Sequence, residues 1–219
     1  MTIRAIVAMS SNKGIGLDNK LPWHFKHDML RFKKLTIGQG NNAIVMGKNT
    51  WNSIGILPYR HNFILTTSTQ FSYVKNNYLI RTFHNISELL AFIQHKYDDI
   101  WVIGGSKIYK SFLDHHIIDD FYITLINKNI HCDTFMHPLP HYYLKKQLIT
   151  NDKLFEGKYK VLYIHYTKIK KEMRLMYKDS HPCVVKDIHF DDFPHIYFSI
   201  EYNGKECQTN ISNLQLYDI

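Results

Sequence analysis

The chain has 219 residues and a mass of 26.0 kDa, and 45% of its residues are hydrophobic and 21% charged. This ordinary composition excludes a disordered or fibrous protein, and no apolar stretch approaches the roughly 20 residues that cross a bilayer. The formal net charge of +8 is compatible with nucleic acid, a membrane surface or an anionic small molecule as partner.

The first 126 residues alternate short apolar runs with helical patterns. Strands are predicted over Ile3–Met9, Ala43–Met46, Phe63–Thr66, Ile100–Ile103 and Phe121–Ile126, and helices over residues 25–36, 87–95 and 106–113. Ser87 and Glu88 are expected to open the second helix as cap and first-turn acid. Strands that are apolar on both faces are typical of a parallel sheet covered by helices on each side. We therefore predict an α/β fold with a mainly parallel central sheet and flanking helices.

An antiparallel edge should follow. The segments Tyr142–Ile149 and Lys160–Thr167 have strand patterns and are separated by a turn-forming stretch over residues 151–157. Beyond the basic stretch over residues 168–171, which contains three lysines, no helical pattern recurs. Strands are expected over Cys183–Phe190, His195–Tyr202 and Lys205–Ile211, and Asn203-Gly204 predicts a type I′ hairpin. This last segment resembles small SH3-type or Tudor-type β-barrels.

The charge distribution supports the same division. Residues 172–219 contain four basic and eight acidic residues and carry −4, so residues 1–171 carry +12. We expect one domain over residues 1–170 and a small β domain over 174–219, although a biased residue usage on a solvated surface would produce the same split. The acidic tail disfavours nucleic acid as a partner. It is either a stabilising or oligomerising appendage or a module for a protein partner, and a monomer and a homodimer both remain open.

Cysteine usage indicates a reducing compartment. Cys132, Cys183 and Cys207 are odd in number, widely spaced and outside any C-x-x-C motif, which disfavours a disulfide framework and a thiolate zinc site. The N-terminus also lacks the pattern of a secretory signal. We expect a cytoplasmic protein with no bound metal and no membrane partner.

An acid interrupts the apolar stripe of the predicted helix over residues 25–36. Phe25, Phe32 and Leu35 share one face of that helix, and Asp28 lies on the same face. An ionised carboxylate buried without a partner is costly, so Asp28 should meet a ligand donor or have a raised pKa. The structural alternative is that an acid in the first helical turn stabilises the helix dipole.

Two strand ends carry glycines and are suited to phosphate. Gly47 precedes a predicted helix start with Lys48 and Thr50, and Gly104-Gly105 precedes the helix that begins at Ser106. Backbone N–H groups at a helix start bind anions, and glycine allows close approach to a pyrophosphate. Neither segment matches a P-loop or a G-x-G-x-x-G motif. The pair favours a dinucleotide bound outside those two standard motifs.

Residues 1–167 resemble dihydrofolate reductase along nearly the whole length of that family. The ordered motifs that carry the resemblance are Gly14-Ile15-Gly16 with Asn19, Leu21-Pro22-Trp23 with Asp28 and Phe32, Met46–Trp51 with Ser53, Ile54 and Gly55, Leu57-Pro58 with Arg60, Val102–Ser106 with Tyr109, and Tyr122-Ile123-Thr124 with Cys132–Phe135. The resemblance implies reduction of 7,8-dihydrofolate to 5,6,7,8-tetrahydrofolate by hydride transfer from NADPH, in support of one-carbon and thymidylate synthesis.

The resemblance also implies site residues. The catalytic set would be Asp28, Leu21, Trp23, Tyr109 and Thr124. The substrate would contact Ile6, Ala8, Asp28, Met29, Phe32, Ile54, Leu57, Arg60, Ile103 and Thr124, with Arg60 on the glutamate carboxylate. NADPH would contact Ala8, Ile15, Gly16, Asn19, Gly47, Lys48, Asn49, Thr50, Leu65, Thr66, Thr67, Ile103, Gly104, Gly105, Ser106, Lys107, Ile108 and Tyr109. The segment Ser10–Trp23 would be a lid with glycine hinges.

Two departures and two alternatives accompany the resemblance. The segment Gly55–Arg60 is shorter by about one residue than the common family form, and Lys48 replaces the arginine of many members. A nicotinamide-dependent reductase of another pterin or pyrimidine is one alternative function, and a non-catalytic binder that retains the fold is the other. Asp28 together with Arg60 favours a folate, and the intact Gly104-Gly105 pair favours an active enzyme.

Overall fold

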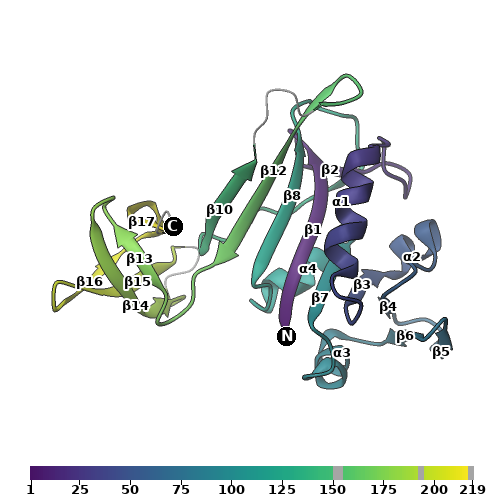
Figure 1. Ribbon diagram of the computed structural model, residues 1–219, viewed down its shortest axis with the longest axis horizontal. Helices are drawn as coiled ribbons and strands as arrows, with labels where there is room; N and C mark the ends of the chain where they lie inside the picture. The colour runs from purple at the N-terminus through teal and green to yellow at the C-terminus, as the bar shows by residue number, and fades with distance from the viewer. Residues whose placement is uncertain (150–154, 192–194, 217–219) are drawn as a thin grey trace. The chain divides into compact units, whose positions relative to one another are not determined.

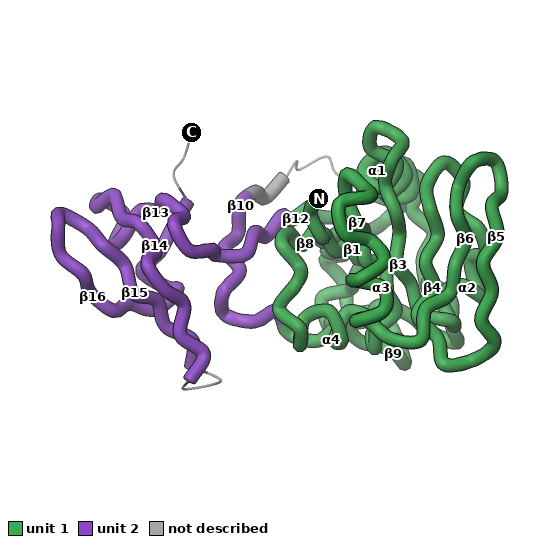
Figure 2. Tube along the Cα trace, turned by 90° about the horizontal axis from the view of Figure 1, so that it is seen from below, with its two compact units in different colours: residues 1–138, 148–164 green, residues 139–147, 165–219 purple. Residues whose placement is uncertain are grey.

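The apolar runs of the N-terminal part form a mainly parallel sheet in a computed structural model that describes residues 1–149, 155–191 and 195–216 (Figure 1). Two units are distinguished. Unit 1 comprises Met1–Pro138 and Leu148–Ile164, and unit 2 comprises Leu139–Gln147 and His165–Ile219 (Figure 2). Most of the turn expected over residues 151–157 lies outside the described residues.

The sheet has a parallel centre and antiparallel additions. Its parallel strands are β1 (Thr2–Ser10), β3 (Ala43–Gly47), β4 (His61–Leu65), β6 (Tyr78–Phe83), β7 (Asp99–Gly104) and β8 (Asp120–Ile126). The strand order is β10-β12-β8-β1-β7-β3-β4-β6-β5, with β10 (Tyr143–Ile149), β12 (Tyr159–Lys168) and β5 (Ser72–Lys75) outside the parallel centre. The short β11 (Phe155–Glu156) pairs with β12, and β2 (Gly14–Gly16) pairs with β9 (Thr134–Phe135). The expected parallel sheet is confirmed, within a mixed sheet.

Four helices connect the parallel strands of unit 1. They are α1 (Lys26–Ile37), α2 (Lys48–Ile54), α3 (Ile86–Ile93) and α4 (Ser106–Asp114), and α1 and α4 cover opposite faces of the sheet (Figures 1 and 2). The predicted cap of α3 was wrong. Asn85, rather than Ser87, caps this helix, because its side chain accepts a hydrogen bond from the Glu88 N–H at 2.9 Å. None of the described helices is long and apolar enough to span a membrane.

The apolar face of α1 divides between two clusters. Phe32 and Leu35 pack on the buried cluster that contains Ile6, Met46 and Trp101. Phe25, which was expected on the same stripe, is the N-cap residue and packs instead with Ile126 and Val161. Asp28 lies between these two anchors in the first turn. The helix is therefore held at both ends, which fixes the position of its acid.

Strand order creates a crevice at the centre of the sheet. The chain leaves β3 through α2 toward β4, whereas it leaves β7 through α4 in the opposite direction toward β8. Neighbouring strands whose connections diverge leave a crevice at their carboxyl ends, where α/β proteins bind ligands. Met46 pairs with Gly104 in this register, so Gly47 and Gly105 follow directly at the crevice.

Unit 2 contains an antiparallel sheet with the order β16-β15-β14-β13-β17. Its strands are β13 (Arg174–Tyr177), β14 (His181–His189), β15 (Tyr197–Tyr202), β16 (Lys205–Thr209) and β17 (Leu214–Gln215), with a 3-10 turn at Ile211–Asn213. The predicted hairpin is confirmed: Tyr202 pairs with Lys205, and both Asn203 and Gly204 have positive φ. In the described part of the chain no pairing joins β16 to β17, so the sheet is open, and closure into a barrel is not observed.

Candidate functional site

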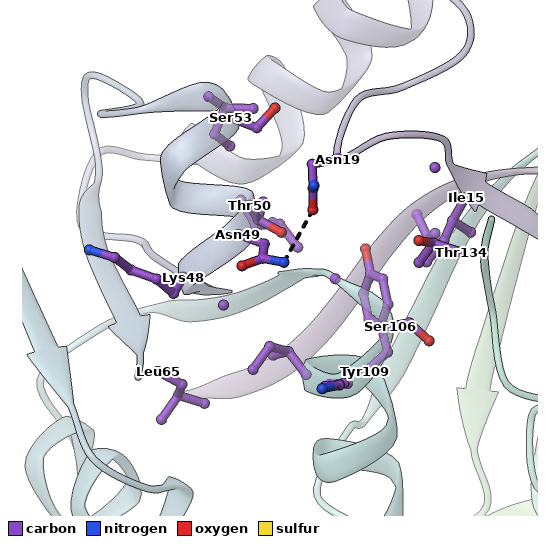
Figure 3. Close-up of a pocket in the computed structure, with 18 of the residues that line it drawn as sticks. Ile15, Asn19, Lys48, Asn49, Thr50, Ser53, Leu65, Ser106, Tyr109 and Thr134 are labelled. Carbon is purple, nitrogen blue, oxygen red and sulfur yellow. Dashed lines mark hydrogen bonds between the residues drawn. The ribbon is translucent and has the colours of Figure 1, made fainter. Parts of the chain in front are cut away.

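A cavity of about 1490 Å³ opens along the carboxyl ends of the central strands of unit 1 (Figure 3). It extends from Asp28 on α1 through the crevice between β3 and β7 to Thr66 and Thr67 after β4. All the predicted site residues line it except Trp23, Arg60 and Gly104. The predicted residues that line the cavity come from seven separate segments of the sequence, at residues 6–8, 15–21, 28–32, 47–57, 65–67, 103–109 and 124.

Asp28 places a carboxylate on the wall of this cavity. The Thr124 hydroxyl donates a hydrogen bond of 2.5 Å to Asp28 Oδ1, and the Asp28 backbone N–H donates to Glu156 Oε1 at 2.9 Å. Burial raises the pKa of Asp28 above its usual value, against the lowering effect of the Thr124 hydrogen bond and of Arg31, while Glu156 raises it further. A partly buried carboxylate with a raised pKa is suited to bind a ligand N–H group and to take part in proton transfer.

Two charged neighbours of Asp28 do not reach the cavity. Arg31 Nη1 lies 3.5 Å from Thr124 Oγ1, and the guanidinium lies over the Tyr163 ring at 4.3 Å from its centroid. Glu156 is 5% exposed and lies 3.4 Å from Nδ1 of the exposed His27. The sequence motifs contained neither Arg31 nor Glu156, because their role arises only from the packing of β8, β11 and β12 against α1.

The cavity wall near Asp28 is apolar. It consists of Ile6, Ala8, Leu21, Met29, Phe32, Ile54, Leu57 and Ile103. Leu21 is 52% exposed, and Met29 and Ile54 are each 44% exposed. These side chains form an open mouth, where a flat aromatic ligand would remove apolar surface from water.

The end of the cavity at the crevice is polar, and its glycines allow a ligand to come close to the backbone. The N-caps of α2 and α4 are Gly47 and Gly105, and neither helix start has a side-chain cap. A Cβ atom at Gly47 would lie 3.0 Å from Ile108 Cγ1, so a side chain there would fill the crevice. Asn49 Nδ2 donates to Asn19 Oδ1 at 3.1 Å across the opening (Figure 3). The uncapped N–H groups at the start of α4 and the Lys48 side chain of α2 line the same cavity, and together they suit an extended phosphate ligand.

Gly104 does not line the cavity, but it allows the Tyr109 ring, which does line it, to pack closely against the backbone. Its φ of 107° lies in the region that favours glycine, and a Cβ atom there would lie 3.0 Å from the Tyr109 ring. The Tyr109 hydroxyl donates to the Ile6 carbonyl at 2.6 Å, and burial raises the pKa of this phenol. The Tyr109 residue therefore lines the cavity, whereas its hydroxyl proton is used in the hydrogen bond to the Ile6 carbonyl.

Arg60 lies behind the apolar wall. It is 2% exposed, and its Nε donates to the Pro58 carbonyl at 2.9 Å while Nη1 donates to Thr36 Oγ1. Among the described residues no carboxylate forms an ion pair with it, and burial lowers its pKa to about 10. A buried guanidinium without an anion favours an anionic ligand group.

Trp23 is the third predicted residue outside the lining. Its ring stacks on Phe25 at 6.3 Å between centroids. The indole N–H is buried and has no hydrogen-bond partner among the described residues. The tryptophan therefore packs at the start of α1, against the cluster that contains Phe25, Ile126 and Val161.

The cavity also contains residues that the sequence predictions omitted. These are Val7, Lys20, Ser53, His84, Asn85, Ile86, Ser87, Ser111, His115, Asp133, Thr134 and Phe135. Most of these residues belong to two stretches of the chain, His84–Ser87 and Asp133–Phe135. His84 to Ser87 follow β6, a strand that was not predicted, and Asp133 belongs to a family motif that had no assigned role. Asp133 Oδ2 accepts a hydrogen bond from the Asp18 N–H at 2.8 Å, so it joins the β2 and β9 segments at the rim.

Comparison with known proteins agrees with this geometry. The family model for dihydrofolate reductase matches residues 2–168. The chain is 32% identical over 194 residues to the bifunctional dihydrofolate reductase-thymidylate synthase of Daucus carota, covering 83% of this chain but only 37% of that protein. It is 34% identical over 139 residues to the dihydrofolate reductase of Staphylococcus aureus (strain MSSA476), covering 63% of this chain and 79% of that one.

A solved structure shares the fold. The dihydrofolate reductase from Enterococcus faecalis, complexed with NADP(H) and RAB-propyl, superposes with a TM-score of 0.64 at 26% identity. The match covers 77% of this chain and 97% of that one.

Proposed function

Because this chain belongs to the dihydrofolate reductase family, we propose that it reduces 7,8-dihydrofolate to 5,6,7,8-tetrahydrofolate with NADPH. One observation carries the proposal: a carboxylate with a raised pKa, Asp28, shares a continuous cavity with the glycine-lined crevice between β3 and β7. The Asp28 carboxylate suits a pterin, and the crevice between β3 and β7 suits a dinucleotide. The name of the carrot relative includes a second activity, which we do not extend to a chain that spans 37% of that protein.

The substrate end positions a pterin. Asp28 Oδ1 is occupied by the Thr124 hydroxyl, which leaves Oδ2 to accept from the amino and ring N–H groups of the pterin. Negative charge at this position favours a proton on N5, and the apolar wall of Ile6, Phe32 and Ile103 excludes water from the ring. We assign the glutamate carboxylate of the substrate to Arg60, which does not line the cavity. The side chains in front of it must move aside before the guanidinium N–H groups that Thr36 and Pro58 leave unused can donate to the carboxylate.

The cofactor end fits NADPH. When bound, NADPH supplies the hydride. Gly47, Gly105 and the start of α4 hold the pyrophosphate, while Lys48, Thr66 and Thr67 provide a cation and hydroxyls for the 2′-phosphate. Ala8, Ile15 and Ile103 hold the nicotinamide against the pterin, and this alignment is the main contribution of the chain to the rate. The remaining contacts are those of Gly16, Asn19, Asn49, Thr50, Leu65, Gly104, Ser106, Lys107, Ile108 and Tyr109.

The segment Ser10–Trp23 acts as a lid. It contains β2, which pairs with β9, and Leu21 and Asn19 on the cavity wall. Trp23 anchors the lid where α1 begins. Closure of such a segment excludes water during hydride transfer.

Two other functions fit the site less well. A reductase of another pterin or pyrimidine has no need of the buried Arg60, which suits the carboxylate of a folate. A non-catalytic binder has no need of the raised pKa of Asp28, because a structural helix-capping acid is most effective when it is ionised.

We propose that residues 1–170 are the reductase domain and residues 174–219 a small β domain of the SH3 or Tudor type. Its buried Leu175, Val185, Phe198 and Ile200 support a core of its own. We assign to this domain a protein partner or a stabilising role, in a monomer or a homodimer. The free Cys132, Cys183 and Cys207 support placement in the cytoplasm.

The test is NADPH oxidation by the purified full-length chain. Absorbance of the reduced nicotinamide should fall when dihydrofolate is added, and an antifolate should abolish the change. A dihydropterin without the benzoyl-glutamate portion serves as the comparison substrate. No oxidation with saturating dihydrofolate would exclude the proposed activity, and equal rates with both substrates would favour a general pterin reductase.

A further inference from the structure

Arg31 lies on the same helix as Asp28, one turn further along, and does not line the cavity. Its guanidinium lies over the Tyr163 ring at 4.3 Å and 5.9 Å from the centroid of the Tyr122 ring. These rings come from β12 and β8, which are neighbouring strands of the sheet, so two adjacent strands hold the arginine. An arginine placed in this way has few rotamers available.

The hydrogen-bond chemistry of the three groups allows one arrangement. Arginine only donates and an ionised carboxylate only accepts, whereas a threonine hydroxyl does both. Arg31 Nη1 lies 3.5 Å from Thr124 Oγ1, and Thr124 Oγ1 lies 2.5 Å from Asp28 Oδ1. The Thr124 oxygen therefore accepts from Arg31, and its proton points to Asp28.

We propose that Arg31 is a positioning residue for Asp28: it orients the Thr124 hydroxyl toward Oδ1 of the carboxylate and neutralises part of the negative charge there. The proposal rests on the proposed function. Through Asp28, Arg31 then sets the pH range in which the pterin receives its proton. With Thr124 on Oδ1, the substrate N–H groups are expected on Oδ2.

Other titratable groups also surround Asp28 and Arg31. Glu156 from β11 accepts from the Asp28 N–H, and His27 of α1 lies on the far side of Glu156. Tyr163 from β12 and Tyr122 from β8 face Arg31, and burial raises the pKa of both phenols. Arg31 is thus the positive group, Glu156 the second negative one, and the two act on Asp28 in opposite directions.

The experiment measures the rate of hydride transfer between about pH 5 and pH 9 by single-turnover kinetics. Asp28 and the substrate N5 share one proton, so the rate falls as pH rises through the apparent pKa of this pair. Arg31→Met removes the cation and should move the fall to higher pH by about one unit. Arg31→Lys keeps the charge and should move it by less than half as much. Glu156→Gln should move it to lower pH.

Lys34→Met is the matched control, because Lys34 is an exposed cation on the same helix. It should leave the pH profile unchanged. An unchanged profile in Arg31→Met, or an equal shift in Lys34→Met, would overturn the proposal. NADPH affinity reports folding, and if Arg31→Met loses it, Arg31→Gln takes its place. Loss of NADPH binding in Arg31→Gln as well would leave Arg31 a purely structural role and overturn the proposal. A wild-type chain without turnover would instead overturn the proposed function.

Discussion

The backbone N–H of Asp28 donates a 2.9 Å hydrogen bond to the carboxylate of Glu156, which lies 128 residues later in the chain. The first N–H groups of a helix have no partner within the helix. Glu156 therefore provides for the start of α1 the cap that its N-cap residue Phe25 does not provide. The β11 segment thereby fixes the acid of the site through its backbone.

This relationship predicts a loss of stability in Glu156→Ala. Removal of a buried acceptor leaves the Asp28 N–H unsatisfied and should cost about 1–3 kcal/mol in free energy of unfolding. Chemical denaturation measures this value. Glu156→Gln keeps an acceptor oxygen and serves as the control, and it should lose less than half as much. An equal loss in both variants would assign the effect to charge rather than to the hydrogen bond.

Asp28→Asn should remove most turnover at neutral pH and leave NADPH binding intact. The amide cannot supply the negative charge that favours a proton on N5, so the rate should fall by about a hundredfold or more. Steady-state NADPH oxidation measures the rate, and quenching of tryptophan fluorescence measures cofactor affinity. Wild-type rates in Asp28→Asn would show that another group assists the proton transfer.

The same substitution should change how stability depends on pH. Burial raises the pKa of Asp28 in the folded chain, so the folded state binds more protons than the unfolded state as pH rises from about 4. Stability that this group contributes at low pH is lost as pH rises through the raised pKa. The Asp28→Asn variant has no carboxyl group at this position, so it does not lose this stability as pH rises. Its Tm relative to wild type should therefore increase from about pH 4 to pH 8, and a constant difference would contradict the raised pKa.

Arg60 should discriminate between substrates with and without glutamate. Arg60→Met removes the buried guanidinium and should raise KM for dihydrofolate about tenfold to a hundredfold, because a charge-assisted pair is lost. Dihydropteroate lacks the glutamate and should show little change between wild type and variant. NADPH affinity controls for folding, since Arg60 also holds Thr36 and Pro58. An equal KM increase for both substrates would assign Arg60 to structure alone.

Deletion of residues 172–219 should preserve catalysis and reduce stability. The cavity residues all precede residue 136, so KM values for both ligands should stay within about twofold. Tyr142 packs on Phe190 at 5.8 Å between centroids, and loss of such a contact should lower Tm by a few degrees. Activity assays and thermal unfolding test both parts. A large loss of NADPH affinity would show that residues 1–170 do not form an independent domain.

Local patterns predicted much of the fold and of the site. The central strands were predicted within about two residues, because runs such as Ala43–Gly47 are buried on both faces and their composition reports that burial. The strands β5 and β6 were missed. β5 is exposed throughout, and β6 contains an arginine and a threonine between its apolar residues, so neither has the continuous apolar run used to identify the others.

The sequence by itself determined the α/β class, the glycines at the ends of β3 and β7, and the acid on α1, because each of these is a property of a short segment. Only the tertiary structure decided which distant groups surround that acid. Arg31, Glu156 and Thr124 approach Asp28 from α1, β11 and β8, and Arg60 is enclosed behind the cavity wall. Burial and the proximity of charges set the pKa of a carboxylate, and both depend on packing between segments that lie far apart in the chain.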